Sequence, residues 1–331
     1  MGRLVVDSEE ERLPTIPSFP IFQGGEKIRI LTIGASPLGM KITEFLQDLG
    51  ATARNPGKYN LDVTDSGRLM MEMARFRPHV VINCAEKSDL SDAERRPEGA
   101  ISVNSIGAAK VALVCRVNDV ELYHISTDQV FSGFGEGGPY STDDDTYPVN
   151  AYGLSKLLGE NAVRAYMRPG RFLIIRVGWL YGKNVKKGPA KDAMDTYIHG
   201  RGDNLRTKRA WLSSRERGTP TFLAAAAFQI AKNVRMKPFD WEVPVVHVAP
   251  KERSISWLAF LEDNFPLVEE VDEKKAGLRH PNVTVPKEGG LIPSAGWETD
   301  GYHRSMSRFL SELEGVSVGD FRTYEGDGQG A

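Results

Sequence analysis

Short apolar runs that alternate with helix-like segments limit the fold of this chain most strongly. Such runs cover residues 28–33, 80–85, 122–125 and 243–247. Apolar runs of this length are typical of strands that are buried on both faces of a sheet. Because strands and helices alternate along the chain, the sequence predicts an α/β fold built on a Rossmann-type, doubly wound parallel sheet.

The composition excludes several classes of protein. The chain has 331 residues, of which 40% are hydrophobic and 26% charged, as in an ordinary globular protein. Its net charge of -2 gives no electrostatic reason to expect nucleic acid or an anionic membrane as a partner. The two cysteines, Cys84 and Cys115, lie in apolar surroundings, which favours buried free thiols over a disulfide or a metal site.

The N-terminus does not have the pattern of a targeting signal. Residues 1–26 contain an acidic cluster followed by Pro14, Pro17 and Pro20, and they lack the basic and apolar regions of a signal peptide. We expect an extension outside the fold, either loosely draped or serving as a docking segment. No uninterrupted apolar run approaches the ~20 residues that span a bilayer, so a cytoplasmic protein is the default expectation.

The first strand leads into a glycine-containing turn. Residues 28–33 are followed by Gly34-Ala35-Ser36-Pro37-Leu38-Gly39 and then by a predicted helix at 40–49. A strand, glycine turn and helix together present backbone N–H groups to a pyrophosphate. The usual fingerprint has three glycines, whereas this turn has two, and Pro37 lacks an N–H. The turn alone therefore indicates a strand-to-helix connection more firmly than a nucleotide.

Arg54 follows the second predicted strand, which ends near Ala53. An acidic residue at this place binds a ribose 2′-hydroxyl, and a basic residue accommodates a 2′-phosphate. Arg54 therefore favours NADP over NAD, with a solvated loop arginine as an equally good interpretation. Asp65 is expected to cap the helix that follows and runs to about Phe76.

Tyr152 and Lys156 form the pair most suggestive of chemistry. They are four positions apart in a helical segment, so they lie on one face of the helix. A phenol whose pKa is lowered by an ammonium group can donate a proton. Ser126 and Thr127, at the end of the preceding strand, could hydrogen-bond the same substrate oxygen. Without this context, the alternative is an exposed tyrosine beside a solvated lysine.

Ligands collect beyond the carboxyl ends of parallel strands, and the polar groups of interest are expected there. Gly34, Ala85, Ser126 and Val177 fall at those ends. Farther along, residues 183–218 are rich in Lys and Arg, which indicates either a solvated face or a basic entrance for an anionic substrate such as a diphosphate.

Several motifs between Lys27 and Leu313 occur in the order of a known family. They are the glycine turn, Leu-Asp-Val-Thr-Asp at 61–65, Val-Val-Ile-Asn-Cys-Ala at 80–85, Val103-Asn104 with Gly107, His-Ile-Ser-Thr-Asp-Gln-Val-Phe at 124–131, Gly138-Pro139-Tyr140, Pro-Val-Asn-Ala-Tyr-Gly-Leu-Ser-Lys at 148–156, residues 176–182 and Gly-Thr-Pro-Thr at 218–221. This combination resembles the extended short-chain dehydrogenase/reductases, most closely the dTDP-4-dehydrorhamnose reductase family.

The resemblance implies an NADP-dependent oxidoreductase of dTDP-rhamnose biosynthesis that reduces the 4-keto group of a nucleotide sugar. Tyr152 would protonate the carbonyl oxygen, Lys156 would hold the nicotinamide ribose, and Thr127 would hydrogen-bond the carbonyl oxygen. The implied substrate-binding residues are Ser126, Asp128 and Trp179. The implied cofactor-binding residues are Gly34, Ser36, Leu38, Gly39, Arg54, Asp62, Cys84, Ala85, Asn104 and Lys156, with Asn104 supporting the lysine through water.

The chain departs from the family at several positions. The middle glycine is absent, Gln129 stands at an aromatic position, residues 86–88 replace a more apolar stretch near the adenosine site, and Ser213-Ser214 falls where acidic residues are common. These departures keep a second function open, a non-catalytic dinucleotide-binding subunit of a larger complex, like the regulatory β subunit of methionine adenosyltransferase. A third possible function is that of an NAD-dependent epimerase or dehydratase on the same fold.

The expected organisation follows from these assignments. Residues 27–182 and 219–249 would form the NADP-binding Rossmann domain, and 183–218 with 250–316 a smaller substrate-binding domain. Residues 317–331 would be a flexible tail. A homo-oligomer, or a protein partner that binds the N-terminal extension, is left open.

Overall fold

A seven-stranded sheet forms the centre of the molecule in the computed structural model. The structure describes residues 27–57, 59–133, 138–182, 185, 210–212, 214, 216–236, 244–252, 254–262, 268–270, 284, 286–299, 301–302 and 305–306. The N-terminal extension, most of the basic segment 183–218, Ser213, most of the region 303–313 where the sequence predicts a last helix, and the tail lie outside these residues.

The sheet has the order β13-β10-β5-β4-β3-β1-β2, and every neighbouring pair is parallel. Its strands are β1 (Arg29–Ile33), β2 (Thr52–Arg54), β3 (Val80–Asn83), β4 (Glu121–Thr127), β5 (Phe172–Val177), β10 (Val245–Pro250) and β13 (Glu298–Thr299). The predicted Rossmann-type, doubly wound parallel sheet is confirmed.

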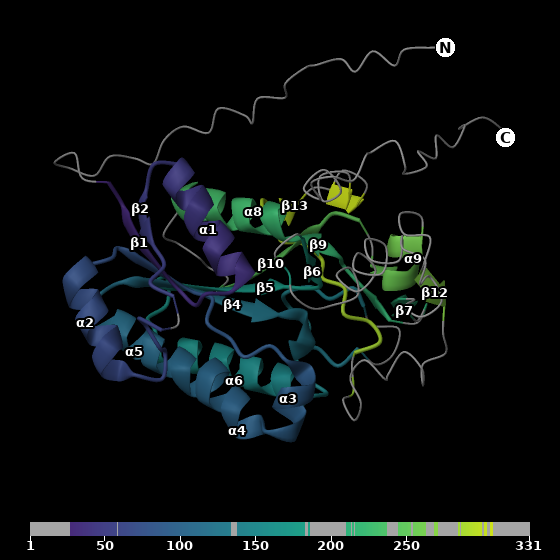
Figure 1. Ribbon diagram of the computed structural model, residues 1–331, viewed down its shortest axis with the longest axis horizontal. Coiled ribbons are helices and arrows are strands. Elements are labelled where there is room, and N and C mark those ends of the chain that lie inside the picture. The colour runs from purple at the N-terminus through teal and green to yellow at the C-terminus, as the bar shows by residue number, and fades with distance from the viewer. Residues whose placement is uncertain are drawn as a thin grey trace, which may run out of the picture.

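Helices cover both faces of the sheet (Figure 1). One layer holds α1 (Pro37–Asp48) and α8 (Leu223–Met236), and the opposite layer holds α2 (Ser66–Phe76), α5 (Ala108–Val117) and α6 (Ala151–Tyr166). Asp65 caps α2 by accepting from the backbone N–H of Arg68 at 3.0 Å, as the sequence predicts. The first helix begins at Pro37, three residues earlier than predicted, because proline fits the first turn of a helix.

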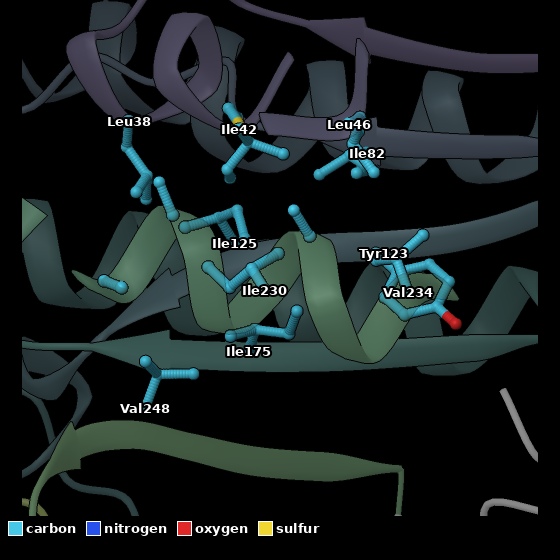
Figure 2. Close-up of a cluster of buried hydrophobic side chains, with 14 of the residues drawn as sticks. Leu38, Ile42, Leu46, Ile82, Tyr123, Ile125, Ile175, Ile230, Val234 and Val248 are labelled. Carbon is cyan, nitrogen blue, oxygen red and sulfur yellow. The ribbon is translucent and has the colours of Figure 1, made fainter. Parts of the chain in front are cut away.

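Two apolar clusters hold these layers together. In Figure 2, Leu38, Ile42 and Leu46 of α1 and Ile230 and Val234 of α8 form one cluster with side chains of the strands. The second cluster joins the other face of the sheet to α2, α5 and α6. Burial of such side chains contributes about 1.5–3 kcal/mol each, so the sheet is the rigid platform for whatever lies at its edge.

Strand β4 is preceded by a long helical stretch with a local irregularity. It comprises α3 (Leu90–Arg95), α4 (Pro97–Ala100) and a π-helical segment η1 (Ile101–Gly107) that continues into α5. By length and composition alone, Pro97–Val117 could cross a membrane, and 44% of its most apolar window is buried inside the molecule. Five of the ten residues of its α5 part are buried, as in a core helix of a domain.

Smaller elements lie beside the carboxyl end of the sheet (Figure 1). Three two-stranded pairs are formed by β6 (Leu180–Tyr181) with β9 (Thr221–Phe222), β7 (Ala210–Leu212) with β12 (Val268–Glu270), and β8 (Arg217–Gly218) with β11 (Ile255–Ser256). A short helix, α9 (Trp257–Glu262), lies beside these pairs. The division into two domains stays a prediction.

The strand order places a site at one edge of the sheet. Order reverses between β1 and β3, which lie side by side, and such a switch point is where doubly wound sheets bind ligands. Strand register aligns Ile33 with Asn83 and Thr127 with Val177. The loops that follow these strands therefore open at the same edge.

A buried ion pair fixes α6 to the sheet. Glu160 of α6 accepts from Arg176 of β5 through both oxygens, at 2.9 Å each, and also from the hydroxyl of Ser126 at 2.6 Å. Glu160 is 0% and Arg176 3% exposed. Burial alone would raise the pKa of Glu160, but the hydrogen bonds and charge of Arg176 hold it below its ordinary value.

Removal of this charge is expected to destabilise the whole fold. Glu160→Gln leaves the Arg176 guanidinium buried without a counter-charge, which costs about 3–5 kcal/mol in comparable pairs. Urea unfolding measures the loss. Glu44→Gln, which breaks the exposed pair Lys41–Glu44, is the control and should cost less than about 1 kcal/mol. Equal losses in the two variants would contradict the account.

Candidate active site

The glycine turn after β1 is packed tightly against the loop after β3. Gly34 has a φ of +102°, and a Cβ there would lie 2.5 Å from the backbone nitrogen of Ala85. A Cβ on Gly39 would lie 2.8 Å from the carbonyl oxygen of Gly34. Both glycines are therefore required by the turn itself. The turn is closely packed although it lacks the middle glycine of the usual fingerprint.

The turn retains the features that hold a pyrophosphate. Ser36 caps α1 by accepting from the backbone N–H of Gly39 at 3.1 Å, and the helix N-terminus carries a partial positive charge. Leu38 is 5% exposed and its side chain lies in the core, so only its backbone is available to a ligand. The residues present thus fit a dinucleotide at this edge.

Two further residues of the predicted cofactor set have structural partners. Asp62 accepts from the backbone N–H of Thr64 at 2.8 Å and from its hydroxyl at 2.7 Å, which fixes the turn before α2. Burial raises the pKa of the Cys84 thiol well above its ordinary value, so the group is an uncharged spacer beside Gly39. The backbone of Ala85 lies next to Gly34.

Tyr152 and Lys156 lie where the sequence predicts, near the start of α6 and against the end of β4. The N-terminus of the helix is capped by Asn150, which accepts from the backbone N–H of Gly153 at 2.8 Å. Lys156 is 1% exposed and donates to the carbonyl oxygen of Ile125 at 2.6 Å. The Tyr152 hydroxyl donates to Oε2 of Glu86 at 3.0 Å. Neither residue is a solvated surface group.

The prediction that Lys156 lowers the pKa of Tyr152 is wrong for this arrangement. Burial raises the pKa of Tyr152 well above its ordinary value, and the charge of Glu86 and its hydrogen bond raise it further. The interaction with Thr127 acts in the opposite direction. Burial also lowers the pKa of Lys156, partly offset by Glu86 and Glu160. Tyr152 is therefore held as a neutral acid.

Thr127 is the last residue of β4, and Asp128 follows it directly. The hydroxyl of Thr127 donates to Oδ1 of Asp128 at 3.0 Å and accepts from the backbone N–H of Gln129 at 3.2 Å. Asp128 is 2% exposed, and its Oδ2 has no hydrogen-bond partner among the described residues. A Cβ added to Gly178 or Gly289 would contact this oxygen at 2.6 or 3.1 Å. A buried acceptor is thus available to a hydroxyl donor.

Two of the predicted site residues, Ser126 and Asn104, hydrogen-bond to other parts of the fold. The hydroxyl of Ser126 donates to Glu160 and the residue is 2% exposed, so it belongs to the buried ion-pair network. Asn104 bonds through its amide to the backbone N–H and carbonyl of Lys87 and to the hydroxyl of Ser155. Its side chain therefore holds the loop after β3 against α6.

Trp179 belongs to an aromatic pair next to Asp128. Its indole stacks on Trp257 of α9, with centroids 4.7 Å apart and planes at 4°. The residue has a φ of +42°, a backbone conformation that is uncommon outside glycine and costs roughly 1–3 kcal/mol. Strained backbone of this kind is often found at functional sites. A Cβ on Gly289 would lie 3.7 Å from the indole nitrogen of Trp179. Trp179 and Asp128 therefore line the same corner.

Arg54 lies at the end of β2 and pairs with a carboxylate. Its Nη1 is 3.2 Å from Oε1 of Glu72 on α2, and its side chain is 38% exposed. The position suits a 2′-phosphate, but Glu72 would compete for the guanidinium. A contact between Arg54 and the 2′-phosphate of NADP therefore stays a prediction.

Sequence reasoning missed Glu86 as a site residue and assigned no structural role to Gln129. Gln129 is 8% exposed and its side-chain oxygen accepts from Asn150 at 3.1 Å, so it supports the cap of α6 in place of an aromatic ring. The signal for Glu86 was a charged residue directly after a buried strand. Its partner Tyr152 is 66 positions away, which no local pattern reveals.

Comparison with known proteins agrees with this geometry. Residues 28–276 match the family model described as the RmlD substrate binding domain. A dTDP-4-dehydrorhamnose reductase from Streptomyces griseus is 40% identical over 155 residues, 46% of this chain and 50% of that protein. One from Mycolicibacterium smegmatis is 37% identical over 154 residues, 46% of each chain. The alignments thus span about half the length of these curated relatives.

Solved structures resemble the chain over nearly its whole length. The dTDP-4-dehydrorhamnose reductase from Bacillus anthracis str. Ames in complex with NADP has a TM-score of 0.75 and 25% identity, covering 87% of this chain and 100% of that one. The enzyme from Clostridium acetobutylicum has a TM-score of 0.75 at 24% identity, covering 86% and 99%, and shows the fold alone. The resemblance found in the sequence is confirmed.

The buried carboxyl of Asp128 predicts a pH-dependent cost to stability. Burial raises its pKa from 3.8 to about 7, against weaker hydrogen bonds from Thr127 and Gln129 that lower it. Because the folded protein binds this proton more tightly than the unfolded chain, the group's contribution to the free energy of unfolding falls as pH rises from 3.8 to about 7.

Asp128→Asn should remove that contribution. Relative to the wild type, the variant should gain free energy of unfolding as the pH rises through this window, by a few kcal/mol at roughly 1.4 kcal/mol per unit of pKa shift. Urea unfolding at a series of pH values measures the gain, with the exposed Asp145→Asn as control. A difference between Asp128→Asn and wild type that does not change with pH would contradict the burial of an ionisable carboxyl.

Proposed function

Because the chain belongs to the RmlD substrate-binding domain family, we propose that it reduces the 4-keto group of a nucleotide-linked deoxysugar with NADPH. The observation that carries the proposal is the convergence of Tyr152, Lys156 and Thr127 beside the glycine turn. The names of the relatives, dTDP-4-dehydrorhamnose reductases, support the same chemistry. So does the NADP found in the Bacillus anthracis structure.

A bound NADPH would supply the hydride for the carbonyl carbon. The pyrophosphate would be held by the turn at 34–39 and by the partial positive charge at the N-terminus of α1. Arg54 would contact the 2′-phosphate once it is released from Glu72. Lys156, fixed on the carbonyl oxygen of Ile125, would orient the nicotinamide ribose.

Reduction needs a proton at the carbonyl oxygen, and Tyr152 is the group placed to give it. The phenol is protonated at neutral pH and can therefore be the acid of the reaction, and its raised pKa extends the protonated form to higher pH. The hydroxyl of Thr127 donates to Asp128 in this structure, and once rotated away from it would donate to the carbonyl oxygen and stabilise the charge that develops there. The phenolate that forms after donation lies near the ammonium of Lys156.

The sugar would lie between this acid and the corner of Asp128 and Trp179. The unsatisfied Oδ2 of Asp128 would accept from a sugar hydroxyl, and the stacked indole of Trp179 would contact the apolar face of the ring. The basic residues of 183–218 remain a proposed contact for the diphosphate. Arg217 lies 3.6 Å from Oε2 of Glu288, and the other basic residues of the segment lie outside the described residues. These contacts would determine how tightly the sugar binds, whereas Tyr152 would determine the rate of the chemical step.

Tyr152→Phe is expected to lower kcat roughly 10²–10⁴-fold, because the reaction loses its proton donor while the buried ring is retained. The measurement follows nicotinamide absorbance during reduction of dTDP-4-dehydrorhamnose. Tyr59→Phe makes the same chemical change at a residue that is 95% exposed, and it should leave kcat unchanged.

Thermal unfolding of both variants excludes a general loss of fold. Turnover by Tyr152→Phe at the wild-type rate would remove Tyr152 from the mechanism. Absence of turnover in the wild-type protein with every 4-keto sugar nucleotide tried would favour the non-catalytic dinucleotide-binding subunit.

A further inference from the structure

Glu86 brings a negative charge into direct contact with the proton donor. Its Oε2 accepts from the Tyr152 hydroxyl at 3.0 Å and lies 3.9 Å from the ammonium nitrogen of Lys156. Its side chain is 29% exposed, so the carboxylate lies at the border between the buried pair and solvent. The roles implied by the family resemblance give this position none.

The backbone beside Glu86 is held in place. The amide of Asn104 accepts from the N–H of Lys87 at 2.7 Å, donates to its carbonyl oxygen at 3.1 Å, and donates to the hydroxyl of Ser155 at 2.8 Å. Asn104 is 1% exposed. One amide thus ties the residue after Glu86 both to η1 and to α6, the helix that carries Tyr152. The distance between the carboxylate and the phenol is therefore a product of the fold.

The charged and titratable groups around Tyr152 come from three places. The loop after β3 supplies Glu86 and Cys84, the start of η2 (Asp128–Val130) supplies Asp128, and α6 itself supplies Lys156. Cys84 is neutral because burial raises the pKa of its thiol. The ammonium of Lys156 donates one hydrogen bond to the carbonyl oxygen of Ile125, which holds it in place beside Tyr152.

The remaining side of the tyrosine ring is apolar. Ala93 of α3 and Ala100 of α4 pack against it, and both are 0% exposed. On α3 the carboxylate of Asp92 is bonded to Lys87 and Arg96, which neutralise it. Glu86 is therefore the carboxylate whose hydrogen bond reaches the phenol.

We propose that Glu86 is a positioning residue whose carboxylate holds the hydroxyl hydrogen of Tyr152 and keeps the phenol protonated until a substrate carbonyl takes over the hydrogen bond. The inference rests on the proposed reductase function and deepens it. In reduction, the hydride adds to the carbonyl carbon and the proton of the phenol passes to the oxygen. The reverse reaction, oxidation of an alcohol, has to start from the phenolate, and in the site without substrate a carboxylate at 3.0 Å disfavours that form.

The direct test is the ionisation of Tyr152 in the absence of substrate. Tyrosinate absorbance is followed against pH for wild type and Glu86→Gln, each with and without Tyr152→Phe, so that subtraction isolates one of the ten tyrosines. Glutamine keeps a hydrogen-bond acceptor and removes the charge. The midpoint for Tyr152 should fall by roughly one pH unit or more in Glu86→Gln.

The controls separate this effect from general changes of charge. Glu98→Gln removes the charge of an exposed glutamate on α4 and should leave the midpoint unchanged. Data are taken above about pH 8.5, where the pKa of Asp128, raised to about 7, leaves its carboxyl ionised in every variant. Far-UV circular dichroism marks the pH at which each variant unfolds.

The pH profile of kcat/KM for ketone reduction gives the second readout. Loss of activity at alkaline pH should begin at a lower pH in Glu86→Gln than in wild type, by the same interval as the midpoint. An unchanged midpoint for Tyr152 overturns the proposal even if the protein is an active reductase. A shifted midpoint without any reductase activity supports the role of Glu86 and refutes the proposed function.

Discussion

The close approach of α6 to η1 and η2 is the constraint on which the site depends. Gly153 and Gly159 face the backbone oxygens of Gln129 and Asn104 so closely that a Cβ at either position would overlap them. This contact lets the ammonium of Lys156 reach the carbonyl oxygen of Ile125 at 2.6 Å. The buried pair of Glu160 and Arg176 holds the same helix one turn farther on. The catalytic geometry is thus a consequence of helix packing.

The sequence predicted the parts of this arrangement that local patterns determine. The buried strands, the glycine turn and the Asp65 cap each depend on neighbouring residues, and each was found in the structure. The motif from Tyr152 to Lys156 was placed correctly on the first turns of a helix. Strand order then follows from general rules of parallel sheets, which bring the strand ends to one edge.

The contacts that the sequence did not predict join residues far apart in the chain. Ser126 was expected to face the substrate, but its hydroxyl donates to Glu160, 34 positions later. For Arg54 the sequence left open a phosphate contact or a solvated loop position, whereas Glu72 of α2 lies 3.2 Å from its guanidinium. The pKa of Tyr152 shifts upward because burial and Glu86 outweigh any effect of the lysine on its own helix. Spacing along one helix cannot reveal such contacts.

The central claim is that the two-glycine turn, with the buried Tyr152 and Lys156, forms a working NADPH site. Titration of the purified protein with NADPH and with NADH, followed by nicotinamide fluorescence, tests it most directly. The account predicts saturable binding of NADPH, tighter than that of NADH because Arg54 offers a cation to the 2′-phosphate. Absence of binding by either nucleotide up to about millimolar concentration, the weak end of specific affinity, would contradict it.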